Sequence, residues 1–128
     1  MDSLPVLDSS AVLAVIFAEP GADKVAGKTQ GALLSTVNLV EVQTRLILRG
    51  SDPDFAWRGI QKLDCEICSL DEKQARIASE IIGKTKPLGL SLGDRVCLAL
   101  AIQRKGKVYT TDRAWTSLSL GVEIEVIR

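Results

Sequence analysis

The stretch LSLGDRVCLALAIQRKGKVYTTDRAW, residues 90–115, contains the pattern that decides the fold class. A Ser-Leu-Gly-Asp start leads into the run Arg95 to Arg104, whose middle is apolar on all sides. A helix of that kind is expected to be buried. The short strand Lys107 to Thr110 follows and ends near Asp112. The stretch therefore predicts a buried helix that leads into a strand of a covered sheet.

The rest of the chain repeats this alternation. Further strands are expected at residues 4–7, 31–36, 64–69 and 122–127. Helical segments are expected at residues 11–18, 22–28, 38–49, 53–63, 70–84 and 114–118. Strands that alternate with helices predict an α/β fold with a mainly parallel central sheet of about five strands and helices on both faces. The length of 128 residues predicts one domain over residues 1–128.

Composition excludes several classes of protein and of chemistry. Hydrophobic residues are 46% and charged residues 25% of the chain, which is typical of a folded globular domain. The absence of histidine excludes Ser-His-Asp and Cys-His catalysis and histidine-containing zinc sites. Aromatic residues are only 4%, so a nucleic acid would be held by its backbone rather than by stacked bases. Lys and Arg together number 16, as do Asp and Glu, so any basic surface must be local.

Cysteine use and the N-terminal sequence bear on the compartment. The three cysteines, an odd number, favour a reducing environment. Cys65-x-x-Cys68 has no second pair and lies in a strand-like run, so we expect the two thiols to be buried for structural reasons. The apolar residues 12–18 are too few to span a bilayer, and no basic segment precedes them. These features predict a cytoplasmic protein with no membrane partner.

Four acidic residues are expected at one edge of the sheet, because helix starts and the carboxyl ends of parallel strands meet there. They are Asp8, Glu41, Asp94 and Asp112, which we call the acidic quartet. Carboxylates brought together repel one another and gain protons unless a hard cation neutralises them. A site that offers only oxygen ligands suits Mg²⁺ or Mn²⁺ and does not suit zinc.

Each member of the quartet also has a purely structural explanation. Asp8 and Asp112 could cap a helix or a turn, and Asp94 could close a capping box with the serine three residues before it. Ser9-Ser10 also offer N-cap oxygens to the helix at 11–18. Glu41 could pair with Arg45 one turn later. The apolar Val37 and Leu48 beside Glu41, however, predict a partly covered side of the helix and a half-buried carboxylate that needs a partner.

Three segments in this order and spacing carry a family resemblance: VLDSSAVLAVIFAEPGADKV (6–25), STVNLVEVQTRL (35–46) and the stretch at 90–115. They resemble the PIN-domain ribonucleases, and in particular the VapC toxins of bacterial toxin–antitoxin pairs. The resemblance places the family's four acids on the acidic quartet and a supporting hydroxyl on Thr110. Ser9 is the second supporting residue we expect. Some relatives carry a further acid where this chain has Thr116.

The resemblance implies an Mg²⁺- or Mn²⁺-dependent ribonuclease. Asp8, Asp94 and Asp112 would hold the metal, and Glu41 would complete the catalytic set. It further implies an RNA substrate, a homodimer and a cognate VapB-like antitoxin that neutralises the toxin. Local basic charge selects Arg95 and Arg113 as RNA contacts, because each directly follows a quartet acid.

Two alternatives of other classes remain open from the sequence. One is a non-catalytic interaction module that keeps the fold and the quartet and acts by binding a partner. The other is a phosphoacceptor receiver domain, for which Ser9 and Ser69 stand where acids would be needed. Hints of a homodimer are limited to the second apolar side of the helix at 38–49 and to Phe55-Ala56-Trp57, which could equally belong to the core.

Overall fold

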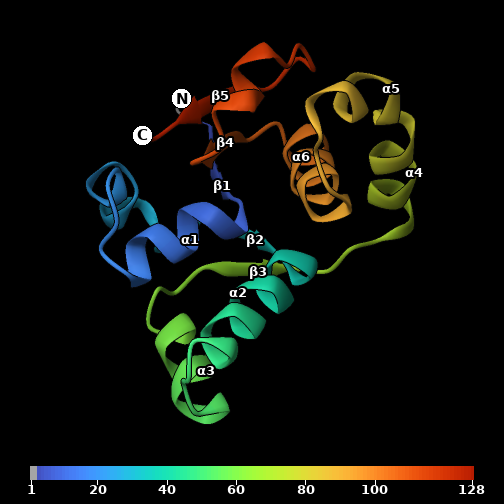
Figure 1. Cartoon of the computed structure of the whole chain (residues 1–128). Helices are drawn as coiled ribbons and strands as arrows, with labels where there is room; N and C mark the ends of the chain where they lie inside the picture. The colour runs from blue at the N-terminus through green and yellow to red at the C-terminus, as the bar shows by residue number, and fades with distance from the viewer. Residues whose placement is uncertain (1–2) are drawn as a thin grey trace.

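The computed structural model describes residues 3–128 and has a central sheet of five parallel strands (Figure 1). The sheet order is β3-β2-β1-β4-β5, and all pairings are parallel. The strands are β1 (Pro5–Leu7), β2 (Leu33–Ser35), β3 (Glu66–Cys68), β4 (Lys107–Thr110) and β5 (Glu123–Val126). The predicted α/β class with a mainly parallel sheet is confirmed.

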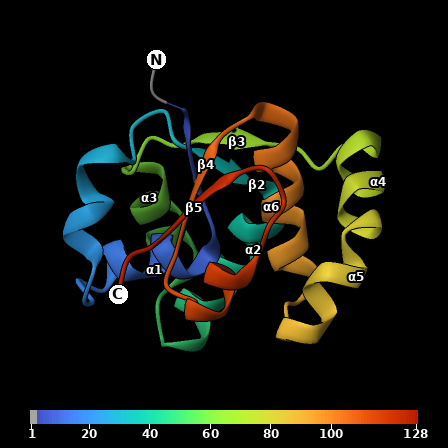
Figure 2. The ribbon, with the colours of Figure 1, turned by 90° about the horizontal axis from the view of Figure 1, so that it is seen from above.

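Helices cover both faces of the sheet, as predicted (Figures 1 and 2). The α-helices are α1 (Ser9–Ile16), α2 (Thr36–Leu48), α3 (Pro53–Gln61), α4 (Glu72–Glu80), α5 (Ile82–Thr85) and α6 (Leu92–Arg104). The 3-10 turns are η1 (Ala22–Lys24), η2 (Ala26–Lys28), η3 (Lys86–Leu88) and η4 (Arg113–Ser117). Helices α1, α2 and α3 lie on one face, whereas α6 lies on the other with α4 and α5 outside it. No helix within residues 3–128 is long and apolar enough to cross a membrane.

Strand alternation divides the core between the two faces. Val6 and Val108, paired across β1 and β4, pack with α6, whereas Leu7 and Tyr109 pack on the side of α1 and α2. Residues 96–101 of α6 are all at most 2% exposed, which confirms the predicted burial of this helix. Each fully buried Leu or Val contributes roughly 1.5–3 kcal/mol through the apolar surface that it removes from water. The sheet and α6 therefore form a rigid base for the residues at the sheet's carboxyl edge.

Three of the predicted helices start, end or wind differently in the structure. Asp8 is the N-cap of α1 and accepts a hydrogen bond from the Ala11 amide at 2.8 Å, so the expected capping by Ser9-Ser10 is not what starts this helix. The helix predicted at 70–84 is broken at Ile81, which caps α4 before α5 begins. The helix predicted at 22–28 is a pair of 3-10 turns.

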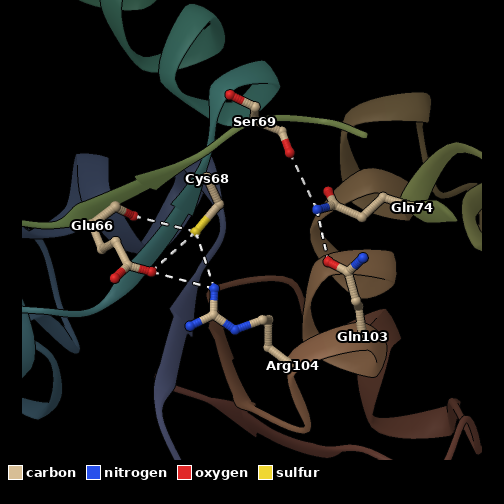
Figure 3. Close-up of polar contacts among 6 residues, drawn as sticks. All are labelled: Glu66, Cys68, Ser69, Gln74, Gln103 and Arg104. Carbon is tan, nitrogen blue, oxygen red and sulfur yellow. Dashed lines mark hydrogen bonds and ion pairs between the residues drawn. The ribbon is translucent and has the colours of Figure 1, made fainter. Parts of the chain in front are cut away.

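Polar contacts fasten edge strand β3 to the end of α6 (Figure 3). Arg104 forms an ion pair with Glu66 at 3.3 Å, and its guanidinium also lies 3.9 Å from the Cys68 sulfur. The thiols of Cys65 and Cys68 are half-buried, so the predicted burial is only partial. Burial raises the pKa of Cys65 to about 11 and also raises that of Cys68, so both thiols stay protonated at neutral pH.

Candidate functional site

The acidic quartet lies at the carboxyl edge of the sheet. Asp8 follows β1 and Asp112 follows β4, while Glu41 and Asp94 lie in the first turns of α2 and α6. Burial raises the pKa of Asp94, and the negative charges of Glu41 and Asp112 raise it further. The charge of Asp94 in turn adds to the raised pKa of Asp8. The structure therefore brings the four predicted acids within electrostatic reach of one another.

Asp8 is the buried member of the quartet, with 4% of its surface exposed. One carboxylate oxygen accepts hydrogen bonds from the Ala11 amide at 2.8 Å and the Ser10 hydroxyl at 2.7 Å. The other oxygen accepts from the Thr110 hydroxyl at 2.5 Å. Burial raises the pKa of Asp8 to about 6, although these three hydrogen bonds act to lower it. A buried carboxylate with no positive partner is costly unless something neutralises it.

Two hydroxyls join the ends of β1 and β4 beneath this site. Thr110 is fully buried, and its hydroxyl oxygen accepts from the Asp112 amide at 3.1 Å. Ser10 accepts from the Thr111 amide at 2.9 Å. Asp112 then caps η4 by accepting from the Ala114 amide at 3.0 Å. Thr110 therefore positions two quartet acids: its hydroxyl donates to the Asp8 carboxylate and accepts from the Asp112 main-chain amide.

Asn38 is the main residue of the site that sequence reasoning missed. Its amide nitrogen donates to the Glu41 carboxylate at 2.8 Å and to the Gly93 carbonyl at 3.2 Å, and the side chain is 1% exposed. Ser9, predicted as a supporting residue, donates to the same Glu41 oxygen. The available signal was an amide three residues before Glu41, inside the otherwise apolar stripe of the helix. Asn38 thus ties α2 to the start of α6.

The surroundings of Glu41 differ from the prediction in two ways. Glu41 is exposed rather than half-buried. Of its two apolar neighbours, Val37 is half-buried against α4 and α6, as expected, whereas Leu48 is 79% exposed. The expected pair with Arg45 is also not made within residues 3–128. Instead, the Glu41 carboxylate packs against Gly93. A Cβ added to Gly93 would lie 2.4 Å from a Glu41 carboxylate oxygen. Only glycine lets Glu41 lie this close to the residue that precedes Asp94.

Three of the quartet acids use only one carboxylate oxygen in hydrogen bonds within residues 3–128. Asp94 and Ser91 form the predicted capping box, in which one Asp94 oxygen accepts from the Ser91 amide at 2.9 Å. Asp112 likewise uses one oxygen for its cap, and Glu41 uses one for its two donors. The second oxygen of each of these three acids accepts no hydrogen bond from residues 3–128. The structural role of these acids therefore leaves lone pairs for a ligand.

The donor chemistry of the quartet fits a hard divalent cation. It offers only carboxylate oxygens, and no Lys or Arg of residues 3–128 forms an ion pair with any of the four acids. As the side chains stand, no three His, Cys, Asp or Glu residues in the described part of the chain are placed as ligands of one ion. Each acid is held in place by its cap or by a hydrogen-bond donor.

The two predicted RNA contacts lie in different settings. Arg95 reaches into the contact between α4 and α6, where its guanidinium donates to the Ala78 carbonyl at 2.8 Å. Arg113 is exposed at the start of η4 and donates to the main-chain oxygen of Arg128 at 3.2 Å. Arg95 is therefore hydrogen-bonded to the end of α4, whereas Arg113 lies on the surface beside Asp112.

The buried amide of Asn38 leads to a stability prediction. Asn38→Asp keeps the shape but replaces the donors to Glu41 and Gly93 with a carboxylate, so we expect a loss of about 1–3 kcal/mol in urea unfolding. Gln43→Glu is the control, because it makes the same chemical change on α2 at a half-buried side chain whose amide makes one hydrogen bond within residues 3–128, to the Pro53 carbonyl. Equal, small losses for both variants would contradict the assigned role of Asn38.

A family model and solved structures place this geometry among known proteins. The model of the PIN domain matches residues 6–119. VapBC from Salmonella typhimurium bound to DNA has a TM-score of 0.74 at 17% identity over 98% of each chain. VapBC2 from Rickettsia felis bound to a promoter DNA fragment has a TM-score of 0.73 at 14% identity, over 95% of this chain and 97% of that one.

A third structure is the sarcin–ricin-loop-cleaving toxin VapC20 of Mycobacterium tuberculosis, with a TM-score of 0.70 at 15% identity over 93% of this chain and 98% of that one. No curated protein matches the chain. At these identities the solved structures establish the shared fold, and the family model covers most of the sequence together with all four quartet acids. This chain belongs to the PIN domain family.

Proposed function

We propose that this protein is a divalent-metal-dependent ribonuclease and acts as a VapC-like toxin. The observation that carries the proposal is the acidic quartet, which collects four carboxylates at the ligand-binding edge of a PIN fold without a cationic partner among residues 3–128. The similarity to VapC20, a toxin described as cleaving the sarcin–ricin loop, supports RNA as the substrate class. Residues 1–128 are proposed to act as one nuclease domain, of which residues 1–2 lie outside the described part.

The quartet would hold Mg²⁺ or Mn²⁺ through Asp8, Asp94 and Asp112, with Glu41 completing the set. When bound, such an ion activates a water molecule and stabilises charge on the scissile phosphate. Thr110 orients the Asp8 carboxylate from below, which fixes the buried ligand before RNA arrives. Ser9 and Asn38 hold one oxygen of Glu41, so its other oxygen is free to accept a hydrogen bond from water.

The proposed partners are an RNA, a VapB-like antitoxin and a second copy of the chain. The Salmonella and Rickettsia structures are VapBC assemblies, which supports an antitoxin of the VapB class here. Exposed apolar side chains on α2 and α3 support a protein partner: Val40, Leu48, Phe55 and Trp57 are 42–79% exposed. A cytoplasmic location without a membrane partner completes the proposal.

A non-catalytic binding module is the second candidate, because three of the quartet acids cap helices and the four side chains are not arranged around one ion. The receiver-domain alternative has no support. Receiver domains of the flavodoxin-like type have strand order 2-1-3-4-5, whereas this sheet has the order β3-β2-β1-β4-β5.

RNA cleavage separates the two remaining candidates. Purified protein is incubated with total bacterial RNA in Mg²⁺, in Mn²⁺ and in EDTA, and 5′-end mapping of the products locates the cuts. We expect discrete cuts that require the divalent ion. Intact RNA under all three conditions, from a protein with a cooperative thermal transition, would favour the binding module.

A further inference from the structure

A recess of about 200 Å³ lies between α1 and α2, next to the acidic quartet. We call it the arginine cleft and define it by Ser10, Phe17, Glu19, Arg45, Arg49 and Arg128. The residues come from α1 and its following turn, from the second half of α2 and from the end of β5. The cleft thus brings Arg128 next to Arg45 and Arg49, which lie one helical turn apart at the end of α2.

The charge of the cleft is mostly uncompensated. Arg45 forms no ion pair within residues 3–128, and the Arg49 guanidinium stacks on the Phe17 ring at 4.5 Å without an acidic partner. Arg128 pairs with Glu19 at 3.4 Å. The three arginines therefore outnumber the one acid of the cleft. Stacking on Phe17 holds the Arg49 plane in place and leaves its N–H donors free for an anion.

The cleft is continuous with the acidic quartet. Ser10 lines the cleft and its hydroxyl donates to Asp8, so this one residue borders both sites. Arg45 lies one helical turn after Glu41 on α2, and Arg49 lies one turn further along. A chain that leaves the quartet along the groove between α1 and α2 meets these arginines in succession.

We propose that the arginine cleft binds the phosphodiester backbone of single-stranded RNA on one side of the scissile phosphate. The inference rests on the proposed nuclease function and extends the substrate site beyond the carboxylates. Four carboxylates repel a polyanion, and the whole chain has a formal net charge of zero, so local cations must hold the RNA. Guanidinium groups match phosphate oxygens with paired N–H donors, which favours phosphate over a neutral ligand.

The test measures binding apart from cleavage. A fluorescently labelled single-stranded RNA is titrated with full-length protein in EDTA, and anisotropy gives Kd over a range of salt concentrations. The salt slope is the slope of log binding constant against log salt concentration. We expect Arg45→Gln and Arg49→Gln each to reduce its magnitude by about 0.7. If a variant binds as wild type does at 1 M salt, this change corresponds to roughly five-fold weaker binding than wild type at 0.1 M salt. Arg45→Lys keeps the charge and is expected to keep the slope.

Arg76→Gln is the control for net charge, because it removes one exposed positive charge, paired with Glu80, on α4 and far from the cleft. Weakening by Arg76→Gln equal to that by the cleft variants would overturn the proposal, since the effect would then reflect net charge alone. Unchanged RNA binding in Arg45→Gln and Arg49→Gln would also overturn the proposal. The cleft would then fit an acidic peptide rather than RNA.

The readout separates this proposal from the nuclease proposal. Arginine-dependent binding without cleavage would support the cleft and count against the ribonuclease. Metal-dependent cleavage with arginine-independent binding would support the ribonuclease and reject the cleft. Thermal melts of each variant confirm that these exposed side chains leave the fold intact.

Discussion

Asp8→Asn is expected to stabilise the metal-free protein at pH 7.5 by up to about 3 kcal/mol while abolishing RNA cleavage. Burial raises the pKa of Asp8 from 3.8 to about 6, and each pKa unit corresponds to about 1.36 kcal/mol. An amide avoids the cost of a buried charge yet can still accept from the Ala11 amide and donate to the Thr110 hydroxyl. A stabilised but inactive variant is the signature of a residue kept for function.

The pH dependence gives the sign of this effect. Because the folded-state pKa lies above the unfolded one, the folded protein binds the extra proton between about pH 4 and pH 6. Below this window Asp8 is protonated and does not lower the stability of the folded protein. Above it the buried charge lowers that stability by the whole amount, up to about 3 kcal/mol. The stability difference between Asp8→Asn and wild type should grow as the pH rises from 4 to about 6 and then stay constant.

Asp71→Asn serves as the control for this prediction. Asp71 also caps a helix, but it is exposed, and its hydrogen bond from the Gln74 amide lowers its pKa. Neutralising it should give no stabilisation at neutral pH. Urea unfolding of the three proteins across pH 4–8, in EDTA, makes the comparison. A destabilised Asp8→Asn protein at pH 7.5 would contradict the buried-charge account.

The second large effect separates capping from catalysis at the start of α6. Asp94→Asn is expected to lower metal-dependent cleavage by about 100-fold or more, because it removes a charged ligand at the centre of the quartet. It should change stability little, since the amide oxygen can still accept from the Ser91 amide. Ser91→Ala should do the reverse: it removes the cap that accepts from the Asp94 amide, costs about 1 kcal/mol, and keeps the carboxylate.

Cleavage rates and urea unfolding of these two variants form one experiment. If Asp94 were only a capping residue, Asp94→Asn would keep both its stability and its activity, and Ser91→Ala alone would lose stability. Equal loss of activity in Ser91→Ala and Asp94→Asn would show that the geometry of the helix start, rather than the carboxylate charge, limits the rate.

The fold and the position of the quartet could be predicted from local patterns. Apolar strands alternating with helices specify a parallel sheet, and this topology places strand ends and helix starts on one edge. That is why Asp8 and Asp112, which are far apart in sequence, meet through Thr110. The apolar run inside α6 likewise predicted its own burial, because no polar face interrupts it.

The contacts within the site could not be predicted in this way. The role of Asn38 depends on how closely α2 approaches the start of α6, which no residue pattern within one helix reports. The exposure of Glu41 and Leu48 depends on the absence of any element of this chain over that side of α2, within residues 3–128. Tertiary placement, rather than helical periodicity, decides these cases.

The most direct test of the central claim is a thermal melt of wild type and Asp94→Asn side by side, titrated with Mg²⁺, Mn²⁺ and Ca²⁺. An ion that binds only the folded protein adds about 2.7 kcal/mol of stability at one hundred times its Kd. We expect the Tm of wild type to rise with the logarithm of the Mg²⁺ or Mn²⁺ concentration above Kd, and the Tm of Asp94→Asn to lack this rise. The same response in both proteins, or no response in either, would contradict a divalent cation site at the acidic quartet.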